Sequence, residues 1–224
     1  MEISDMQTVS IRLVPTAPIR RGASERVGAI LDAADRVLTR IAISDVKLLD
    51  ISTEAGIAKA TIYHFFPSSE AVLVGLLRRY LSSMDETVSH KLANAPQIQW
   101  QALIRSLFES VRSFYVTHPI CAELVFRTGG FGGLQATDDE HIDEWARFAC
   151  QVFTARYHVP HISQIERRVA IALAISDRIW AMDIRDGIVS DFIFEESQRA
   201  IIAYLANFLP PMMTMRDEGG LYDA

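Results

Sequence analysis

Two short helix patterns separated by one glycine lie in residues 47–73, KLLDISTEAGIAKATIYHFFPSSEAVL, and this segment constrains the fold most. The first pattern has the three-and-four spacing of one helix face, with apolar residues at Leu48, Ile51 and Ala55. Gly56 follows where a helix must end and turn. A second, very short helix ends at Pro67, and Ser68 offers a cap for a longer helix that begins near Ser69.

The second short helix is expected to have a buried back and a polar front. Its inward-facing residues would be Ile57, Ile62 and Phe66, and its outward-facing residues would be Lys59, Thr61, Tyr63 and His64. The aromatic run from Tyr63 to Phe66 has a simpler interpretation as a helix end packed in a core. Four consecutive residues cannot all face inward on a helix of about 3.6 residues per turn, so some of them must be exposed. A short helix with an exposed polar front is typical of a DNA-reading unit.

This segment, with the helix before it, resembles the DNA-binding domain of the TetR family of transcriptional regulators. The resemblance is strong over residues 24–81, and beyond them it extends only to length and an all-helical pattern. It is carried by Ile51, Ala55-Gly56-Ile57, the run from Lys59 to Pro67, and the run from Glu70 to Leu73. As a set of spaced matches, these residues are specific.

The resemblance implies which side chains would face DNA. They are Lys59, Ala60, Thr61, Tyr63, His64 and Ser69, with Lys59 a phosphate or base contact and Tyr63 and His64 near the backbone or base edges. Arg20 and Arg21 would reach the DNA backbone or minor groove, with a solvated tail as the equally weighted alternative.

Two positions depart from the family pattern. Ala58 stands where many members have a serine that caps the recognition helix, and the missing cap is worth about 1 kcal/mol. Ser69 stands where many have a lysine, which removes one positive charge that would contact phosphate.

The net charge of −6 is unevenly distributed, which reconciles an acidic chain with DNA binding. Residues 1–80 hold ten Lys or Arg against nine Asp or Glu, giving +1, and residues 81–224 hold twelve against nineteen, giving −7. The phosphate attraction must therefore come from a few placed residues and helix N-termini, and affinity should depend on dimerisation.

The chain is expected to be all-α, with about nine helices, because no strand pattern of comparable length is present. We predict a flexible arm at 1–22, a three-helix DNA-binding domain at 23–81, a ligand-binding and dimerisation domain at 82–210, and a tail at 211–224. Ser24 is expected to cap the first helix, whose apolar stripe extends to Ile41.

Boundaries in the second half follow turn and capping signals. A short helix entered at Pro119 is expected to end at Gly129-Gly130, and FGGLQA is expected to be a loop. Thr137 and Ser163 each precede a glutamate by three residues, the capping-box spacing, and are expected to begin two helices. A last helix is expected from Ser190 or Asp191 to Leu209.

Large aromatic residues are concentrated beyond residue 96, where all three tryptophans lie. Such side chains wall a pocket or fill a core, and at helical spacing the core is the commoner role. The family resemblance implies a small-molecule effector site, for which the candidates are Trp100, Phe108, Phe114, Tyr115, Phe126, Trp145, Phe148 and Trp180.

The last two helices are expected to form a homodimer. Small residues at Ala170, Ala172, Ala174, Ser176 and Ala181 would allow close packing of one helix, and its neighbour offers Ile201, Ile202, Tyr204, Leu205, Phe208 and Leu209. With their two-fold copies they would form a four-helix bundle, unless both faces are buried inside one subunit.

Other functional classes find little support. The longest apolar run, Val169 to Ile175, is far shorter than the roughly 20 residues of a spanning helix, and the N-terminus does not have the pattern of a signal peptide, so a cytoplasmic location without membrane contact is expected. His158 and His161 are separated by Pro160 and lack a nearby carboxylate, so neither a metal nor another cofactor is predicted. No catalytic constellation is found, and no enzyme activity is predicted.

These patterns predict a homodimeric, ligand-responsive regulator, most simply a repressor, that binds a palindromic operator in double-stranded DNA and is released by a small apolar or amphipathic effector. The alternative is a helical small-molecule-binding protein, or an enzyme on the same scaffold, that does not use DNA. Ala58 and Ser69 favour that alternative.

Overall fold

The computed structural model describes residues 21–127 and 131–216, and every regular element in these ranges is a helix. The elements are α1 (Arg21–Leu38), the short 3-10 helix η2 (Ile43–Asp45), α2 (Leu48–Ala55), α3 (Lys59–Phe65), α4 (Ser69–Ala93), α5 (Trp100–Thr117), α6 (Pro119–Phe126), α7 (Gly132–Arg156), α8 (Ile165–Trp180) and α9 (Asp191–Leu205). The predicted all-α class with about nine helices is confirmed for the described ranges. Most of the predicted arm and tail, residues 1–20 and 217–224, lie outside them.

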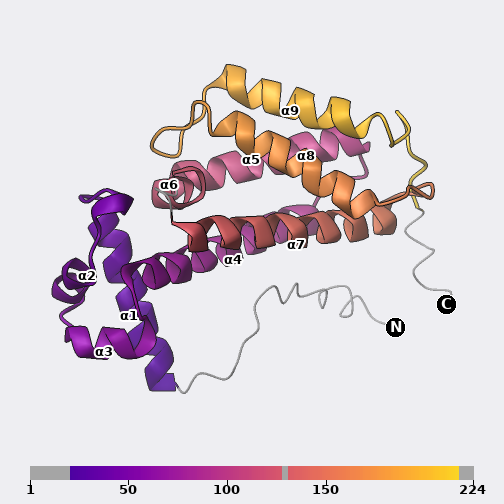
Figure 1. The fold of residues 1–224 in the computed structure, drawn as a ribbon. Coiled ribbons are helices and arrows are strands. Elements are labelled where there is room, and N and C mark those ends of the chain that lie inside the picture. Colours follow the sequence, from indigo (N-terminus) through magenta and orange to yellow (C-terminus); the bar gives the residue numbers. More distant parts are fainter. Residues whose placement is uncertain (1–20, 128–130, 217–224) are drawn as a thin grey trace.

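At one end of the molecule, α1, α2 and α3 pack together around the start of α4 (Figure 1). Their common core consists of fully buried aliphatic side chains, among them Ile30, Ile51, Ile62, Leu73 and Leu76. The predicted turn after α2 is confirmed, because Gly56 has a φ of 63°, a left-handed conformation that glycine adopts without steric cost. The Ser52 hydroxyl also donates to the Ile57 carbonyl oxygen at 2.7 Å, which fixes the entry to α3.

The long helix α4 connects the two ends of the molecule. Its N-terminus is capped as predicted, since the hydroxyl oxygen of Ser68 accepts a hydrogen bond from the Ala71 amide at 3.1 Å. The Tyr80 hydroxyl donates to Asp35 of α1 at 2.5 Å, which ties α4 to the first group of helices. Further along, α4 packs against α5, α6 and α7.

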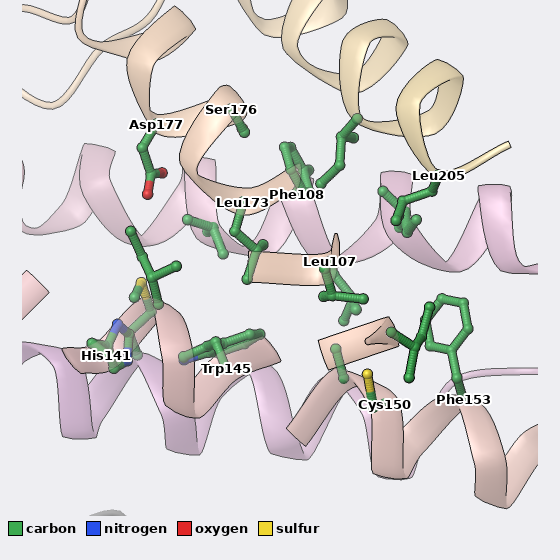
Figure 2. Close-up of a pocket in the computed structure, with 18 of the residues that line it drawn as sticks. Leu107, Phe108, His141, Trp145, Cys150, Phe153, Leu173, Ser176, Asp177 and Leu205 are labelled. Atoms are coloured by element: carbon green, nitrogen blue, oxygen red, sulfur yellow. The ribbon is translucent and has the colours of Figure 1, made fainter. Parts of the chain in front are cut away.

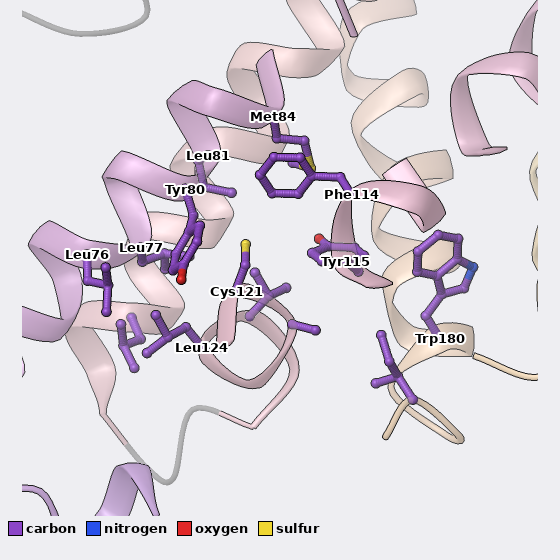
Figure 3. Close-up of a cluster of buried hydrophobic side chains, with 14 of the residues drawn as sticks. Leu76, Leu77, Tyr80, Leu81, Met84, Phe114, Tyr115, Cys121, Leu124 and Trp180 are labelled. Carbon is purple, nitrogen blue, oxygen red and sulfur yellow. The ribbon is translucent and has the colours of Figure 1, made fainter. Parts of the chain in front are cut away.

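The remaining helices form a bundle over the second half of α4. In Figure 1, α8 and α9 lie side by side, with α5 and α7 beneath them. Figure 3 shows a cluster of buried apolar side chains, where Tyr80 and Leu81 of α4 face Cys121 of α6 and Phe114 of α5. None of the helices in the described ranges is long and apolar enough to cross a membrane.

Several predicted boundaries are wrong for identifiable reasons. Ser24 is not a cap, because it lies inside α1, which is described from Arg21 onward. The helix ends at Leu38, so Ile41 packs on the core from the following turn. At the other end, α9 ends at Leu205, and residues 206–208 form a turn before Leu209.

The FGGLQA segment is also mostly helical, because α7 begins at Gly132. Glycine is needed here because α7 and α4 approach each other closely. A Cβ atom on Gly133 would lie 2.9 Å from the Glu70 carboxylate and 3.2 Å from Val74 of α4. The Gly133 amide donates to Glu70 Oε1 at 2.8 Å, so a residue that suggested a loop instead allows α7 to begin against α4.

Neither predicted capping box in this half is used. Thr137 lies inside α7, where its hydroxyl donates to the Gly133 carbonyl oxygen at 2.8 Å. The residue preceding α8 is Gln164, with a φ of 54° and no side-chain cap, so Ser163 is one residue too early. The predicted start of the last helix is confirmed, since α9 begins at Asp191, and the Ser190 hydroxyl oxygen caps it by accepting from the Ile193 amide at 3.4 Å.

Candidate functional site

The front of α3 is exposed, as its amphipathic pattern predicts. Lys59, Ala60, Tyr63 and His64 are all exposed, with 48% of Tyr63 accessible, while Ile62 is fully buried behind them. Thr61 is half-buried rather than exposed, so it contributes less to this face than expected. The Lys59 ammonium lies 5.4 Å from the centre of the Tyr63 ring, which places a cation and an aromatic ring side by side on the open surface.

The surroundings of this face add few free positive charges. Arg36 of α1 and Arg40 of the turn after α1 both bind the Glu54 carboxylate of α2, at 2.7 and 2.6 Å, and these hydrogen bonds lower the pKa of Glu54. Ser69 is half-buried in the first turn of α4, and Ala58 precedes α3 without a side-chain cap. Arg20 lies outside the described residues, and only the backbone of Arg21 is described.

A cavity of about 170 Å³ lies inside the second helical group. Its walls come from α4, α5, α7, α8 and α9, together with residues that follow α7 and α9. Met84 places α4 directly in this wall. Figure 2 shows the cavity from one side, with His141 and Asp177 at one end and Phe153 and Leu205 at the other.

Four of the eight aromatic candidates line this cavity: Phe108, Tyr115, Trp145 and Trp180. The other four pack elsewhere. Trp100 is fully buried and donates its indole N–H to the Pro210 carbonyl oxygen at 2.9 Å. Phe114 stacks on His118, Phe126 packs edge-on against Tyr115, and Phe148 packs edge-on against Trp145. Helical periodicity identifies the inward face, but it does not separate the cavity wall from the core beside it.

The polar end of the cavity is the part that the sequence analysis missed. It is formed by Asp138 and His141 of α7 and by Ser176 and Asp177 of α8. Burial raises the pKa of Asp138 to about 6, and burial together with the charge of Asp138 raises the pKa of Asp177 to about 8. One signal was present in the sequence, since the Ser-Asp pair interrupts an otherwise apolar stretch that begins at Val169.

A buried polar network joins this end of the cavity to α4. Asp85 of α4 is only 7% exposed, and its Oδ1 atom is 2.9 Å from His141 Nε2 and accepts the Trp145 indole N–H at 2.6 Å. His141 and Trp145 both line the cavity. These contacts of Asp85 therefore connect the cavity wall to α4, the helix that follows α3.

The family model described as "Bacterial regulatory proteins, tetR family" matches residues 30–76, which include α2, α3 and the start of α4. Residues 30–76 of this chain therefore belong to the TetR family. The chain's curated relatives include the HTH-type transcriptional regulator EthR of Mycobacterium tuberculosis (strain H37Rv), 30% identical over 133 residues. That match covers 58% of this chain and 57% of EthR, so the chain spans a little over half the length of EthR. The HTH-type transcriptional regulator BetI of Rhizobium meliloti is 32% identical over 95 residues, 42% of this chain and 44% of that protein.

Solved structures share the fold over most of this chain. A TetR-family transcriptional regulator from Streptomyces coelicolor aligns with a TM-score of 0.66 at 17% identity, covering 82% of this chain and 99% of that one. The fatty acid degradation regulator FadR from Bacillus halodurans aligns with a TM-score of 0.57 at 15% identity, covering 80% and 94%. At these identities the likeness concerns the fold alone.

The predicted dimer surface is partly buried inside the subunit. Three of its α9-side residues, Ile201, Leu205 and Leu209, line the cavity, and two small residues of α8, Ala172 and Ser176, are buried. Ala174 remains exposed, Ala170, Ala181, Ile202, Tyr204 and Phe208 are half-buried, and Ile171 is 42% exposed. The outward apolar face of α8 and α9 is therefore narrower than the sequence pattern suggests. In the described ranges no group of three His, Cys, Asp or Glu is arranged to hold a metal ion.

Proposed function

We propose that this chain is a ligand-responsive transcriptional repressor that binds a palindromic operator as a homodimer. The observation that carries the proposal is the exposed front of α3, where Lys59, Tyr63 and His64 stand above a fully buried Ile62. A helix with one exposed polar face and one buried apolar face can enter the major groove while its buried face packs on the domain core. The proposed DNA-binding domain spans residues 23–81, and the proposed ligand-binding and dimerisation domain spans residues 82–210.

DNA contacts would divide between positioning and reading. Lys59 and the hydroxyl of Ser69 would contact phosphate, and Tyr63 and His64 would lie near the backbone or base edges. Ala60 is exposed and small, which would let the helix approach the bases. With Arg36 and Arg40 paired to Glu54, each subunit would have a modest phosphate grip, and two linked subunits would be needed for tight binding.

Dimerisation would use the outward faces of α8 and α9, around Ile171 and Ala174. A two-fold dimer would present two copies of α3 to half-sites separated by about 34 Å, one turn of DNA, or by a multiple of it. A transcriptional role would place the protein in the cytoplasm.

Effector binding would change DNA affinity through α4. Met84 of α4 lines the cavity, and Asp85 holds His141 and Trp145 of the opposite wall. At its other end, α4 is tied to α1 through Tyr80 and Asp35. A ligand that shifts α7 against α4 would therefore change the separation of the two α3 helices, and a coupling of about 1–3 kcal/mol would suffice for regulation.

The test is binding of the purified chain to fluorescent DNA from upstream of its own gene, followed by anisotropy across a salt series. We expect Tyr63→Ala and Lys59→Ala to weaken binding by about tenfold or more each, and Lys59→Ala to reduce the salt slope by about 1. Lys91→Ala is the matched control, because it removes the same charge from an exposed site in the last turn of α4. Binding that is absent, insensitive to salt, or equally affected by all three substitutions would contradict the proposal.

A further inference from the structure

Two carboxylates meet at one end of the cavity, one from each of two facing helices. Asp138 lies on α7 and Asp177 lies on α8, and both line the cavity. Both side chains are half-buried, and neither carboxylate takes part in a hydrogen bond or ion pair within the described ranges. Figure 2 shows Asp177 directed from α8 into the space above His141. A half-buried carboxylate without a partner loses part of its solvation, so this arrangement favours a ligand that supplies a partner.

The charge at this end is not cancelled by the protein. Among the cavity-lining residues His141 is the only base, and its Nε2 atom already lies 2.9 Å from Asp85. His141 is therefore hydrogen-bonded to Asp85, and beyond the lowering effect of His141 on the pKa of Asp138, the wall supplies no lysine or arginine to Asp138 or Asp177. A ligand carrying a carboxylate or phosphate would meet electrostatic repulsion here, and a cation would meet attraction.

A third polar side chain lies at the same end. Ser176 is 4% exposed as a residue and lines the cavity, and no hydrogen bond of its hydroxyl is found within the described ranges. A hydroxyl oxygen with free lone pairs can accept one of the three N–H donors of an ammonium group. The rings of Trp145 and Tyr115, which also line the cavity, add faces to which a cation is attracted.

The rest of the cavity is apolar and small. Leu107, Phe153, Leu173 and Leu205 are among its walls away from the carboxylates. A cavity of about 150 Å³ in another protein holds one benzene molecule, so the volume of about 170 Å³ here suits a compact apolar group.

We propose that the cavity binds a small primary amine with a compact apolar body, whose ammonium group lies between Asp138 and Asp177 and donates to Ser176. The apolar body extends toward Phe153 and Leu205. This inference rests on the proposed effector role of the cavity and narrows it to a chemical class.

The test uses three probes with the same apolar body and different head groups: 2-phenylethylamine, 2-phenylethanol and phenylacetate. Calorimetric titration at pH 7.5 is expected to give the tightest binding for the amine, about tenfold tighter than for the alcohol, with phenylacetate weakest. Asp177→Asn combined with Asp138→Asn keeps the side-chain shapes and removes both groups that can ionise against the ammonium, so the preference for the amine should disappear. Asp139→Asn is the matched control, because Asp139 is the exposed neighbour of Asp138 on the same helix.

Equal affinity for the three probes, tightest binding of phenylacetate, binding of none of them, or an amine preference that survives the double substitution would overturn the proposal. Circular dichroism melting of each variant shows whether it is folded, and the comparison of probes on the unmodified protein does not depend on any variant. DNA binding is measured separately. A chain that binds operator DNA but shows no amine preference would refute this inference alone, and one that binds the amine but not DNA would refute the proposed repressor.

Discussion

The front of α3 and the polar end of the cavity differ in how they are built. The α3 face is made by consecutive residues of one short helix, exposed above a fully buried Ile62. The cavity end is made by Asp138 and Asp177, which lie 39 positions apart in the sequence on two helices that meet only in the folded chain. A surface built within one helix is visible in sequence periodicity, and a site built between helices depends on tertiary packing.

The largest expected effect tests the division of α3 into a buried back and an exposed front. Ile62→Ala should lower the free energy of unfolding by about 2–5 kcal/mol, because it removes buried methylene groups and leaves a cavity. Tyr63→Ala, one residue away but 48% exposed, should change it by less than about 0.5 kcal/mol while weakening DNA binding. Urea unfolding of both variants checks this, and similar losses in the two would show that Tyr63 belongs to the core.

The next effect is a pH dependence of folding stability that comes from the carboxyl groups at the polar end of the cavity. The folded-state pKa of Asp177 is raised from 3.8 to about 8, so the folded chain holds a proton that the unfolded chain releases. Stability should therefore fall as pH rises from about 4 to 8, by at most about 1.4 kcal/mol per unit for this group. Asp138, with a pKa raised to about 6, adds to the fall at the lower end of this range.

Asp177→Asn should reduce the change in the free energy of unfolding between pH 6 and 8. Denaturant unfolding at several pH values measures this free energy. The titratable groups around Asp177 include Asp138, Asp139 and His141 of α7 and Tyr115 of α5. Asp139→Asn, on the exposed side of α7, serves as the control. A profile that Asp177→Asn leaves unchanged would mean that Asp177 is not buried in the folded chain.

A smaller effect is expected at the turn before α3. Gly56 has a φ of 63°, and a Cβ atom there would have no neighbour within 4 Å, so Gly56→Ala should cost only the conformational strain of about 1–2 kcal/mol. Gly187 has a φ of 74°, but its Cβ would lie 2.1 Å from the Tyr115 carbonyl oxygen, so Gly187→Ala should cost more. Thermal unfolding of the two variants compares them, and equal losses would show that the contact with Tyr115 is absent.

The smallest expected effect separates a used cap from an unused one. Ser68→Ala should cost about 1 kcal/mol, because the Ser68 hydroxyl oxygen accepts from the Ala71 amide. Ser163→Ala should cost almost nothing, since Gln164 precedes α8 and no side-chain cap is present there. Chemical unfolding of both variants measures the difference, and a loss at Ser163 equal to that at Ser68 would contradict the helix boundary at Ile165.

Sequence patterns predict the first group of helices well because their signals are local. Gly56, Pro67 and Ser68 each act on the residues next to them, and all three mark the boundaries that the structure has. Gly132 and Thr137 mislead because tertiary contacts outweigh local preference: glycine lets α7 start against Glu70, and the threonine hydroxyl finds a partner one turn back. The aromatic candidates are all placed on inward faces, but only packing decides that Phe108 lines the cavity and Phe114 stacks on His118.

The central claim is that occupation of the cavity controls DNA reading at α3. The most direct measurement is the affinity of the chain for its upstream DNA, by fluorescence anisotropy, with and without saturating 2-phenylethylamine. The account predicts that the amine weakens DNA binding by about 5- to 150-fold, and that the Asp138→Asn, Asp177→Asn double variant loses this response while still binding DNA. An unchanged DNA affinity under conditions where calorimetry shows the amine bound would contradict the claim.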